Sequence, residues 1–510
     1  MNEIMFCKYR KARNMRASGI LLPVASLPSE YGIGCFSKEA YDFVDGLAKA
    51  HQSYWQILPL GPTSYGDSPY QSFSTFAGNP YFIDLEALIE EGLLTKEECD
   101  ECDFGDDNRY IDYGKIYDSR FGLLWNAFER ADLEQDGAFQ KFVKDNSEWL
   151  EDYALFMAIK DSNDGVAWTE WNEDIKLRDE RALALYAEEL EEDVQFYKFL
   201  QYLFVKQWLK LKKYANDKGI QIIGDIPIYV AFDSADCWAN TKLFQFTTEN
   251  IPKAVAGCPP DAFAADGQLW GNPLYDWEYH KSTDYAWWMK RVAYSFQLYD
   301  VVRIDHFRGF DEYYSIPFGD TTAVNGHWEK GPGIDLFNAL TKKLGKLNII
   351  AEDLGYLTES VIKLVGDTGY PGMKIMQFAF DSREESNYLP HTYTKNTVVY
   401  TGTHDNDTIQ GWYDSISDSD KIYAGKYLNN AKRKRADLHW DYIRATMASV
   451  SDTAIIPMQD YLGLGSEARI NIPSTLGTNW KWRLLKDEFS EELMKKIAQM
   501  TDIYERYIEP

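Results

Sequence analysis

Four acidic residues stand where short apolar, β-branched runs end, which is where a strand leaves a buried sheet. They are Asp225 in Ile-Ile-Gly-Asp, Asp305 in Arg-Ile-Asp-His, Glu352 in Ile-Ile-Ala-Glu and Asp405 in Thr-His-Asp-Asn. The carboxyl ends of parallel strands meet on one face of a barrel, so we expect these four side chains to converge. Because like charges repel one another, such convergence is typical of a site that uses them.

Two of these carboxyl groups have neighbours that predict opposite roles. Arg303 and Asp305 are two residues apart in a predicted strand, so both point to the same face, and a guanidinium favours an ionised carboxylate. Asp305 is therefore the candidate nucleophile. Glu352 follows three apolar residues, where loss of hydration raises the pKa of a carboxyl group toward that of a general acid. This combination is typical of glycoside chemistry.

Other reaction classes lack their motifs in this sequence. It contains no Gly-x-x-x-x-Gly-Lys-Ser/Thr loop, no Gly-x-Ser-x-Gly elbow and no His-Glu-x-x-His helix. Residues 404–407 (His-Asp-Asn-Asp) offer ligands for a divalent cation, and Cys99 with Cys102 forms a Cys-x-x-Cys pair. No second His-rich or Cys-rich segment completes either set, so the prediction is no metal and no cofactor.

Eight apolar runs have the length and composition of strands that are covered on both faces. They are residues 20–24, 54–60, 221–226, 301–304, 348–351, 374–378, 397–401 and 454–458. Apolar residues at a helical period fill the gaps, for example at Phe199, Leu203 and Leu211. The alternation predicts an α/β fold, a (β/α)8 TIM barrel that forms one catalytic domain over residues 1–510.

Two intervals are too long to be simple connections in such a barrel. Residues 84–218, approximately, are acidic with helical patterning, and they predict an inserted helical subdomain. Residues 244–292, approximately, combine Pro and Gly with Phe263, Trp270 and Trp277. Long aromatic loops are often binding loops, so we expect this interval to form an active-site lid over the cleft.

Composition narrows the range of partners. The chain has 80 acidic and 53 basic residues, a formal net charge of −27, which disfavours nucleic acid. No apolar run approaches the ~20 residues of a membrane span, so no membrane partner is expected. The six cysteines are irregularly spaced and form no disulfide framework, so a reducing cytoplasm is the expected location. The protein is expected to be a monomer or a homodimer. The 16 Trp, 35 Tyr and 27 Phe supply rings that stack on uncharged sugars.

Five segments resemble, in order, motifs of the amylomaltases, the 4-α-glucanotransferases of glycoside hydrolase family 77. The segments are residues 66–71, 270–275, 303–307, 351–355 and 402–406, and the likeness extends over residues 18–482. The resemblance implies a retaining enzyme of carbohydrate metabolism. Such an enzyme moves α-1,4-glucan segments from a donor to the 4-hydroxyl of glucose or of another glucan.

On the matching positions, the resemblance implies that Asp305 is the nucleophile, Glu352 the acid/base and Asp405 a third acid that holds the donor sugar. The implied substrate contacts are Tyr70, Ser68, Asp225, Asp261, Phe263, Trp270, Asn272, Arg303, His404 and Asn471. The sequence departs from some relatives at Ala262, where they have Tyr, and at Ser474, where Gly is common.

Two alternatives share the same barrel. An α-amylase-type hydrolase also uses two Asp and one Glu, and it differs in passing the sugar to water. A glycan-binding barrel without activity belongs to another class, although every expected catalytic acid is present in this sequence. The products formed from maltotriose as the only substrate distinguish a transferase from a hydrolase and from an inactive binding protein.

Overall fold

The computed structural model describes residues 16–64, 66–260, 265–355, 357–383, 385–430 and 434–508. Eight parallel strands form one sheet in the order β10-β11-β12-β1-β2-β3-β6-β9. Their bounds are β1 Ala17–Leu21, β2 Tyr54–Gln56, β3 Gln221–Pro227, β6 Val301–Asp305, β9 Ile349–Ala351, β10 Gly372–Ile375, β11 Thr397–Tyr400 and β12 Thr453–Pro457. Each strand overlaps one of the eight predicted runs, so the barrel prediction is confirmed.

The sheet closes on itself between β9 and β10, because the N–H of Ala351 donates to the carbonyl of Pro371 at 2.9 Å. Alternate strand residues point into the barrel and out toward the helices. One apolar cluster draws buried side chains from six strands, Leu21, Ile223, Ile350, Met373, Ile375, Val398, Tyr400 and Ile455. Their neighbours Ile20 and Ile222 belong to the larger cluster outside. Burial on both faces explains why the runs do not alternate with polar residues.

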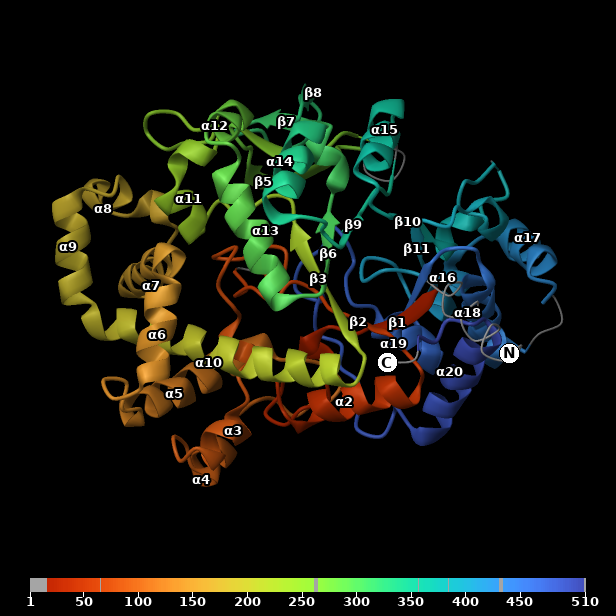
Figure 1. Cartoon of the computed structure of the whole chain (residues 1–510), viewed down its shortest axis with the longest axis horizontal. Helices are drawn as coiled ribbons and strands as arrows, with labels where there is room; N and C mark the ends of the chain where they lie inside the picture. Colours follow the sequence, from red (N-terminus) through yellow and green to blue (C-terminus); the bar gives the residue numbers. More distant parts are fainter. Residues whose placement is uncertain are drawn as a thin grey trace, which may run out of the picture.

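Helices surround the barrel, and a large helical group lies at its side (Figure 1). Between β2 and β3 the chain forms α3 Leu85–Glu90, α4 Lys96–Asp100, α5 Tyr113–Arg130, α6 Gly137–Asp145, α7 Ser147–Ser162, α8 Glu173–Lys176, α9 Glu180–Glu189 and α10 Glu191–Asp217. Asp112, Asp136 and Asp179 precede three of these helices, and their carboxylates accept the first free N–H groups.

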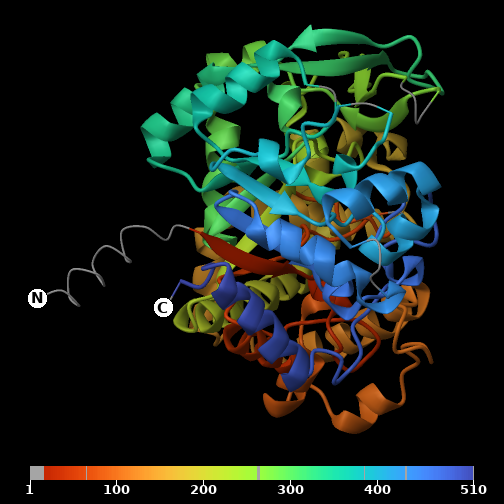
Figure 2. The same cartoon turned by 90° about the vertical axis from the view of Figure 1, so that its right-hand side faces the viewer.

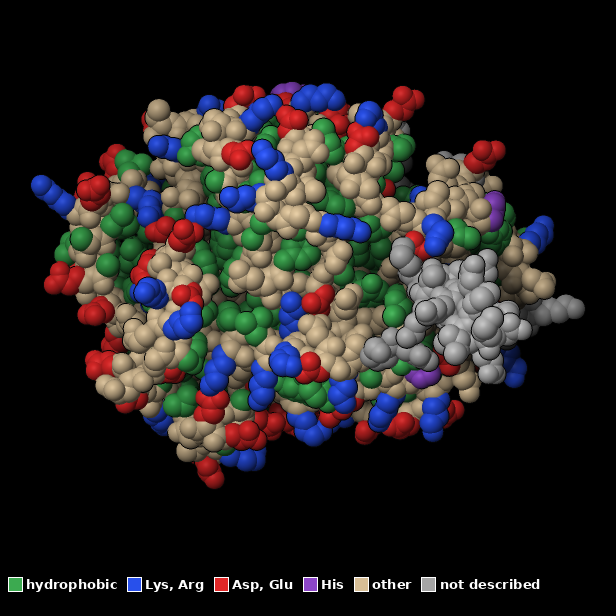
Figure 3. Space-filling view, in the orientation of Figure 1, with side chains coloured by type: hydrophobic (Ala, Val, Ile, Leu, Met, Phe, Trp, Pro, Cys, Tyr) green, Lys and Arg blue, Asp and Glu red, His purple; other side chains and the backbone are tan. Residues whose placement is uncertain are grey.

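The remaining helices follow the other strands. They are α2 Lys38–Lys49, α11 Ala235–Ala239, α12 Trp277–Ser282, α13 Ala286–Leu298, α14 Ile334–Leu344, α15 Glu359–Thr368, α16 Ile409–Ser415, α17 Asp418–Tyr427, α18 Leu438–Ala448, α19 Met458–Leu462 and α20 Glu491–Ile503. Within the described ranges, no helix has the length and apolar character needed to cross a bilayer. Figure 3 shows acidic and basic side chains interspersed over one face, with no region of a single sign.

A second, antiparallel sheet was not predicted from the sequence. Its strands are β4 Ala254–Cys258, β5 Gln268–Pro273, β7 Glu312–Pro317 and β8 His327–Lys330, in the order β5-β4-β7-β8. Figure 2 shows its green strands at the upper edge of the molecule. Two of them lie in the interval expected to be a loop. The strands β4 and β8 lack a strand signal because β4 contains Gly257 and β8 is polar and mostly exposed.

Candidate functional site

A buried ion pair joins the ends of β3 and β6. The parallel register of these strands places Asp225 opposite Arg303. Both carboxylate oxygens of Asp225 accept from Nη1 of Arg303, at 2.9 and 2.7 Å. Gly224 lets the strand pass close to the Tyr299 ring, which a Cβ at this position would approach to 2.1 Å. Burial raises the pKa of Asp225 to about 6, although the Arg303 charge acts in the opposite direction.

The same guanidinium reaches Asp305. Nη2 of Arg303 lies 3.0 Å from Oδ1 of Asp305, as expected for two residues on one face of a strand. Burial would lower the pKa of Arg303, but the charges of Asp225 and Asp305 outweigh it and hold this pKa well above its ordinary value. The Asp305 side chain keeps 30% of its exposure, whereas that of Asp225 has none. Asp305 is thus the member of the triplet that a substrate can reach.

Glu352 leaves the barrel at the end of β9, next to β6. Its carboxyl oxygens accept from the backbone N–H of His306 at 2.7 Å and of Leu354 at 2.9 Å. His306 has a left-handed φ of 53°, which turns the chain toward Glu352 directly after Asp305. Burial is the main cause that raises the pKa of Glu352 to about 7, and repulsion from Asp305 is the second cause. This carboxyl group can therefore give and take a proton near neutral pH.

Asp405 is held as an anion by its neighbours. Nδ2 of Asn471 donates to Oδ1 of Asp405 at 2.6 Å, and Nε2 of His404 lies 3.4 Å from Oδ2. Burial alone would raise the pKa of Asp405, but the His404 charge and the hydrogen bonds from His404 and Asn471 outweigh it and lower this pKa. The side chain of Asp405 keeps 44% of its exposure, so it can accept hydrogen bonds from a ligand.

Asp460 holds the loop that carries His404 and Asp405. It is 1% exposed, and it accepts from Oγ1 of Thr401 at 2.5 Å and from the N–H of Ile409 at 2.7 Å. These two groups flank the loop on either side. Burial raises the pKa of Asp460 to about 6. Sequence analysis missed this residue, although it follows the last apolar run, as the other acids follow theirs.

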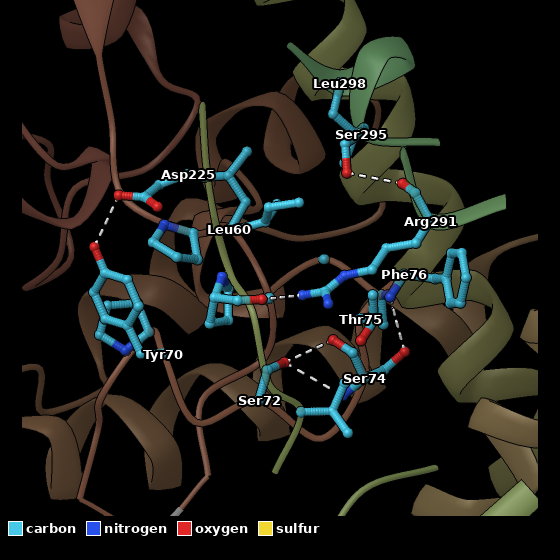
Figure 4. A pocket seen from close by; sticks show the side chains of 18 of the residues that line it. Leu60, Tyr70, Ser72, Ser74, Thr75, Phe76, Asp225, Arg291, Ser295 and Leu298 are labelled. Atoms are coloured by element: carbon cyan, nitrogen blue, oxygen red, sulfur yellow. Dashed lines mark hydrogen bonds between the residues drawn. The ribbon is translucent and has the colours of Figure 1, made fainter. Parts of the chain in front are cut away.

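Three rings lie together beside the Asp225–Arg303 pair. Tyr70 donates its hydroxyl to Oδ2 of Asp225 at 2.9 Å (Figure 4). Its ring stacks on His404, with centroids 5.1 Å apart. Trp480, which sequence analysis also missed, lies 5.9 Å from Tyr70. Ser68 accepts the N–H of Tyr70 at 3.3 Å, so it supports the turn that presents this ring. The result is an aromatic surface at the barrel end.

Two predicted substrate contacts lie on β5, and they differ in role. Trp270 presents a ring near the site, whereas the amide of Asn272 is part of the protein structure. Trp270 meets His306 edge to face, with centroids 4.8 Å apart, which places an indole next to the turn after Asp305. Asn272 is buried, and its Nδ2 donates to the carbonyl of Val230 at 2.8 Å, which fixes the strand. Outside the described residues lie two further predicted contacts, Asp261 and Phe263.

The arrangement has the groups for a double displacement at a sugar carbon. Asp305 offers an oriented carboxylate, Glu352 a proton donor near neutral pH, and Asp405 an anionic hydrogen-bond acceptor. In the part of the chain that the structure describes, no three His, Cys, Asp or Glu side chains are grouped as a metal site.

Known proteins with similar sequences and structures share one description. A family model described as 4-alpha-glucanotransferase matches residues 22–487. A 4-alpha-glucanotransferase of Clostridium butyricum is 52% identical over 95% of this chain and 99% of that protein. The chloroplastic/amyloplastic 4-alpha-glucanotransferase of Solanum tuberosum is 41% identical, over 98% and 87%. The solved amylomaltase of Streptococcus agalactiae with acarbose superposes with a TM-score of 0.94, at 44% identity, over 97% of this chain and 100% of that one.

Proposed function

The chain belongs to the 4-alpha-glucanotransferase family, and from this premise we propose that Asp305, Glu352 and Asp405 transfer α-1,4-glucan segments by a retaining double displacement. The observation that carries the proposal is the position of Arg303. It pairs with the buried Asp225 and orients the exposed Asp305, while Glu352 beside them has a pKa of about 7. The substrates are an α-1,4-glucan donor and an α-1,4-glucan or glucose acceptor.

In the first step, a carboxylate oxygen of Asp305 attacks the anomeric carbon of the donor. The bond from that carbon to the leaving oxygen breaks, and Glu352 gives its proton to this oxygen. The product is a β-linked glucosyl ester on Asp305, and the shortened chain departs with a free 4-hydroxyl group. The loss of its proton leaves Glu352 as a carboxylate, ready to act as a base.

In the second step, Glu352 takes the proton of the acceptor 4-hydroxyl, and that oxygen displaces Asp305 from the anomeric carbon. Two inversions restore the α configuration. Asp405 accepts hydroxyl hydrogens of the donor sugar, and the Tyr70, His404 and Trp480 rings form an apolar surface for it. We place Trp270 on the acceptor side, where an indole excludes water from the ester.

Maltotriose as the only substrate tests the function directly. Transfer predicts glucose together with a ladder of longer maltodextrins, without a rise in the total number of reducing ends. The physical reason is that each bond broken is replaced by a new one. Chromatography of the products with a reducing-end assay measures both quantities. Shorter sugars alone, with one new reducing end for each cleavage, would show an α-amylase-type hydrolase instead.

Asp460→Ala is expected to lower kcat roughly 10²-fold, because the loop with Asp405 loses both of its flanking hydrogen bonds. Asp460→Asn is the matched control. Its oxygen still accepts from Ile409 and its amide can donate to Thr401, so kcat should stay within several-fold of the native value. Steady-state kinetics on maltotriose and a melting curve distinguish the two. An equal loss in both variants would contradict a positioning role.

The cytoplasm is the location we propose for this activity. Four of the described cysteines, Cys35, Cys99, Cys102 and Cys237, form no disulfide bond within the described residues. Free thiols support a reducing compartment. We also propose that residues 84–218, approximately, form an inserted helical subdomain and that residues 244–292, approximately, cover the cleft as a lid. The protein is proposed to be a monomer or a homodimer.

A further inference from the structure

A second cavity opens between the inserted helices and the barrel. This outer cavity, of about 300 Å³, is lined by side chains of α7, α11 and α13, and by none of the three proposed catalytic carboxyl groups. We propose that the outer cavity binds a segment of α-1,4-glucan, as a site separate from the one where the chemistry occurs. The identity of the ligand rests on the proposed function, while the shape and chemistry of the site do not.

Aromatic rings form a corner in the outer cavity. Trp149 of α7 and Tyr294 of α13 are both partly exposed, with centroids 5.8 Å apart and planes 63° apart. The Trp149 ring is fixed by Phe76, at 6.1 Å and nearly parallel, and by a 3.2 Å hydrogen bond from its indole N–H to Asn146. Rings held in place in this way present an apolar surface on which the C–H face of a sugar packs.

One buried polar group of the residues that line the outer cavity has no hydrogen-bond partner in the described part of the chain. Trp287 is 8% exposed, and its indole Nε1 is buried without a hydrogen bond. Two further polar side chains line the cavity, the partly exposed Tyr294 and the exposed Gln297, so a ligand can reach both. A buried donor left unpaired is costly, so a ligand that supplies acceptors and donors is favoured. Sugar hydroxyl groups supply both.

The charged groups that line the outer cavity are either ion-paired or buried, which favours a neutral ligand. Three carboxylates on its rim form ion pairs, Asp145 with Lys141, Glu148 with Lys290 at 2.7 Å, and Asp152 with Arg178 at 2.6 Å. The fourth, Asp236, is 4% exposed and accepts the N–H of Thr75 at 2.7 Å. A phosphorylated ligand would find no unpaired cation among the lining residues, since Lys290 is paired with Glu148, and Asp236, the carboxylate without an ion pair, is buried; an uncharged glucan needs neither.

The outer cavity lies behind the donor side of the proposed active site. The inner cavity in Figure 4 has Tyr70 and Asp225 at one end, and it shares Ser74, Phe76 and Tyr294 with the outer cavity. A glucan held there would stay close to the enzyme between transfers, which raises its local concentration. This benefit applies to long chains that reach both sites, and not to maltotriose.

The test compares long and short glucans in matched variants. Trp149→Ala removes one ring of the corner, and Ala293→Trp fills the cavity from α13 without removing any ring. Trp125→Ala is the control, since Trp125 is a partly exposed tryptophan on α5, packed on Phe196 at 4.7 Å, that does not line the cavity. Amylose binding is measured by affinity electrophoresis. Each substitution is combined with Asp305→Asn, so that the protein does not degrade the amylose during the measurement. Maltotriose transfer is measured without Asp305→Asn.

We expect Trp149→Ala and Ala293→Trp to weaken amylose binding about fivefold to tenfold, with maltotriose kcat/KM within about twofold of native. Trp125→Ala should bind amylose as tightly as Asp305→Asn alone, and its maltotriose kcat/KM should equal the native value. Equal amylose binding in all variants, or a parallel loss of maltotriose transfer, would overturn a separate site. Failure of the unmodified protein to act on maltotriose would contradict the proposed function, and weaker amylose binding in the two cavity variants would still support the outer site.

Discussion

Asp305→Asn is expected to lower the kcat of glucan transfer by roughly 10⁴-fold or more. The amide cannot form the covalent ester, and the pairing with Arg303 that orients the native carboxylate is weakened. KM should change far less, because Tyr70, which Asp225 holds in place, and Asp405 remain to bind the donor. Initial rates on maltotriose, with a circular dichroism spectrum to check the fold, measure the effect.

Asp335→Asn is a suitable control, since Asp335 is an exposed residue paired with Lys281 at the surface. Its rates should equal the native ones. A second control removes the nucleophile completely. In Asp305→Gly, azide should attack the vacated face of α-glucosyl fluoride and give the β-glucosyl azide, with fluoride as the leaving group. Formation of the α-azide, or residual transfer above about a tenth of native in Asp305→Asn, would contradict the nucleophile assignment.

Glu352→Gln should have an effect that depends on the leaving group. Transfer from maltotriose needs a proton on the departing oxygen, so its rate should fall by roughly 10³-fold. α-Glucosyl fluoride needs no such proton, so formation of the glucosyl ester from it should be nearly native. Single-turnover rates with both donors measure the difference. An equal loss on both would show that Glu352 is not the general acid, and Glu359→Gln, an exposed glutamate at the start of α15, is the matched control.

The pH profile follows from the same carboxyl group. Burial and Asp305 raise the pKa of Glu352 to about 7, and the free enzyme must hold this proton to cleave the donor. The kcat/KM for maltotriose should therefore fall about tenfold per pH unit above pH 7. With Glu352→Gln and α-glucosyl fluoride, the fall above pH 7 should be absent. A fall at the same pH in both would assign it to another group.

Much of the site could be predicted because its signals are local. An apolar run that is buried on both faces ends where the chain meets solvent, so the acids at strand ends could be found from the residues alone. Arg303 and Asp305 share a face because strand residues alternate, and the structure joins them at 3.0 Å. Asp460 could have been found by the same rule. The strands β4 and β8 could not, because Gly and exposed polar residues carry no strand pattern.

The sequence by itself determined which eight segments form the barrel and which carboxyl groups stand at its open end. Only the tertiary structure decided what these groups face. The register of β3 and β6 pairs Asp225 with Arg303, and the turn at His306 gives Glu352 two backbone donors. The outer cavity is lined by residues of α7 and α13, which are far apart in sequence and which the fold brings to one site. Such contacts depend on barrel closure and side-chain packing, which no local periodicity encodes.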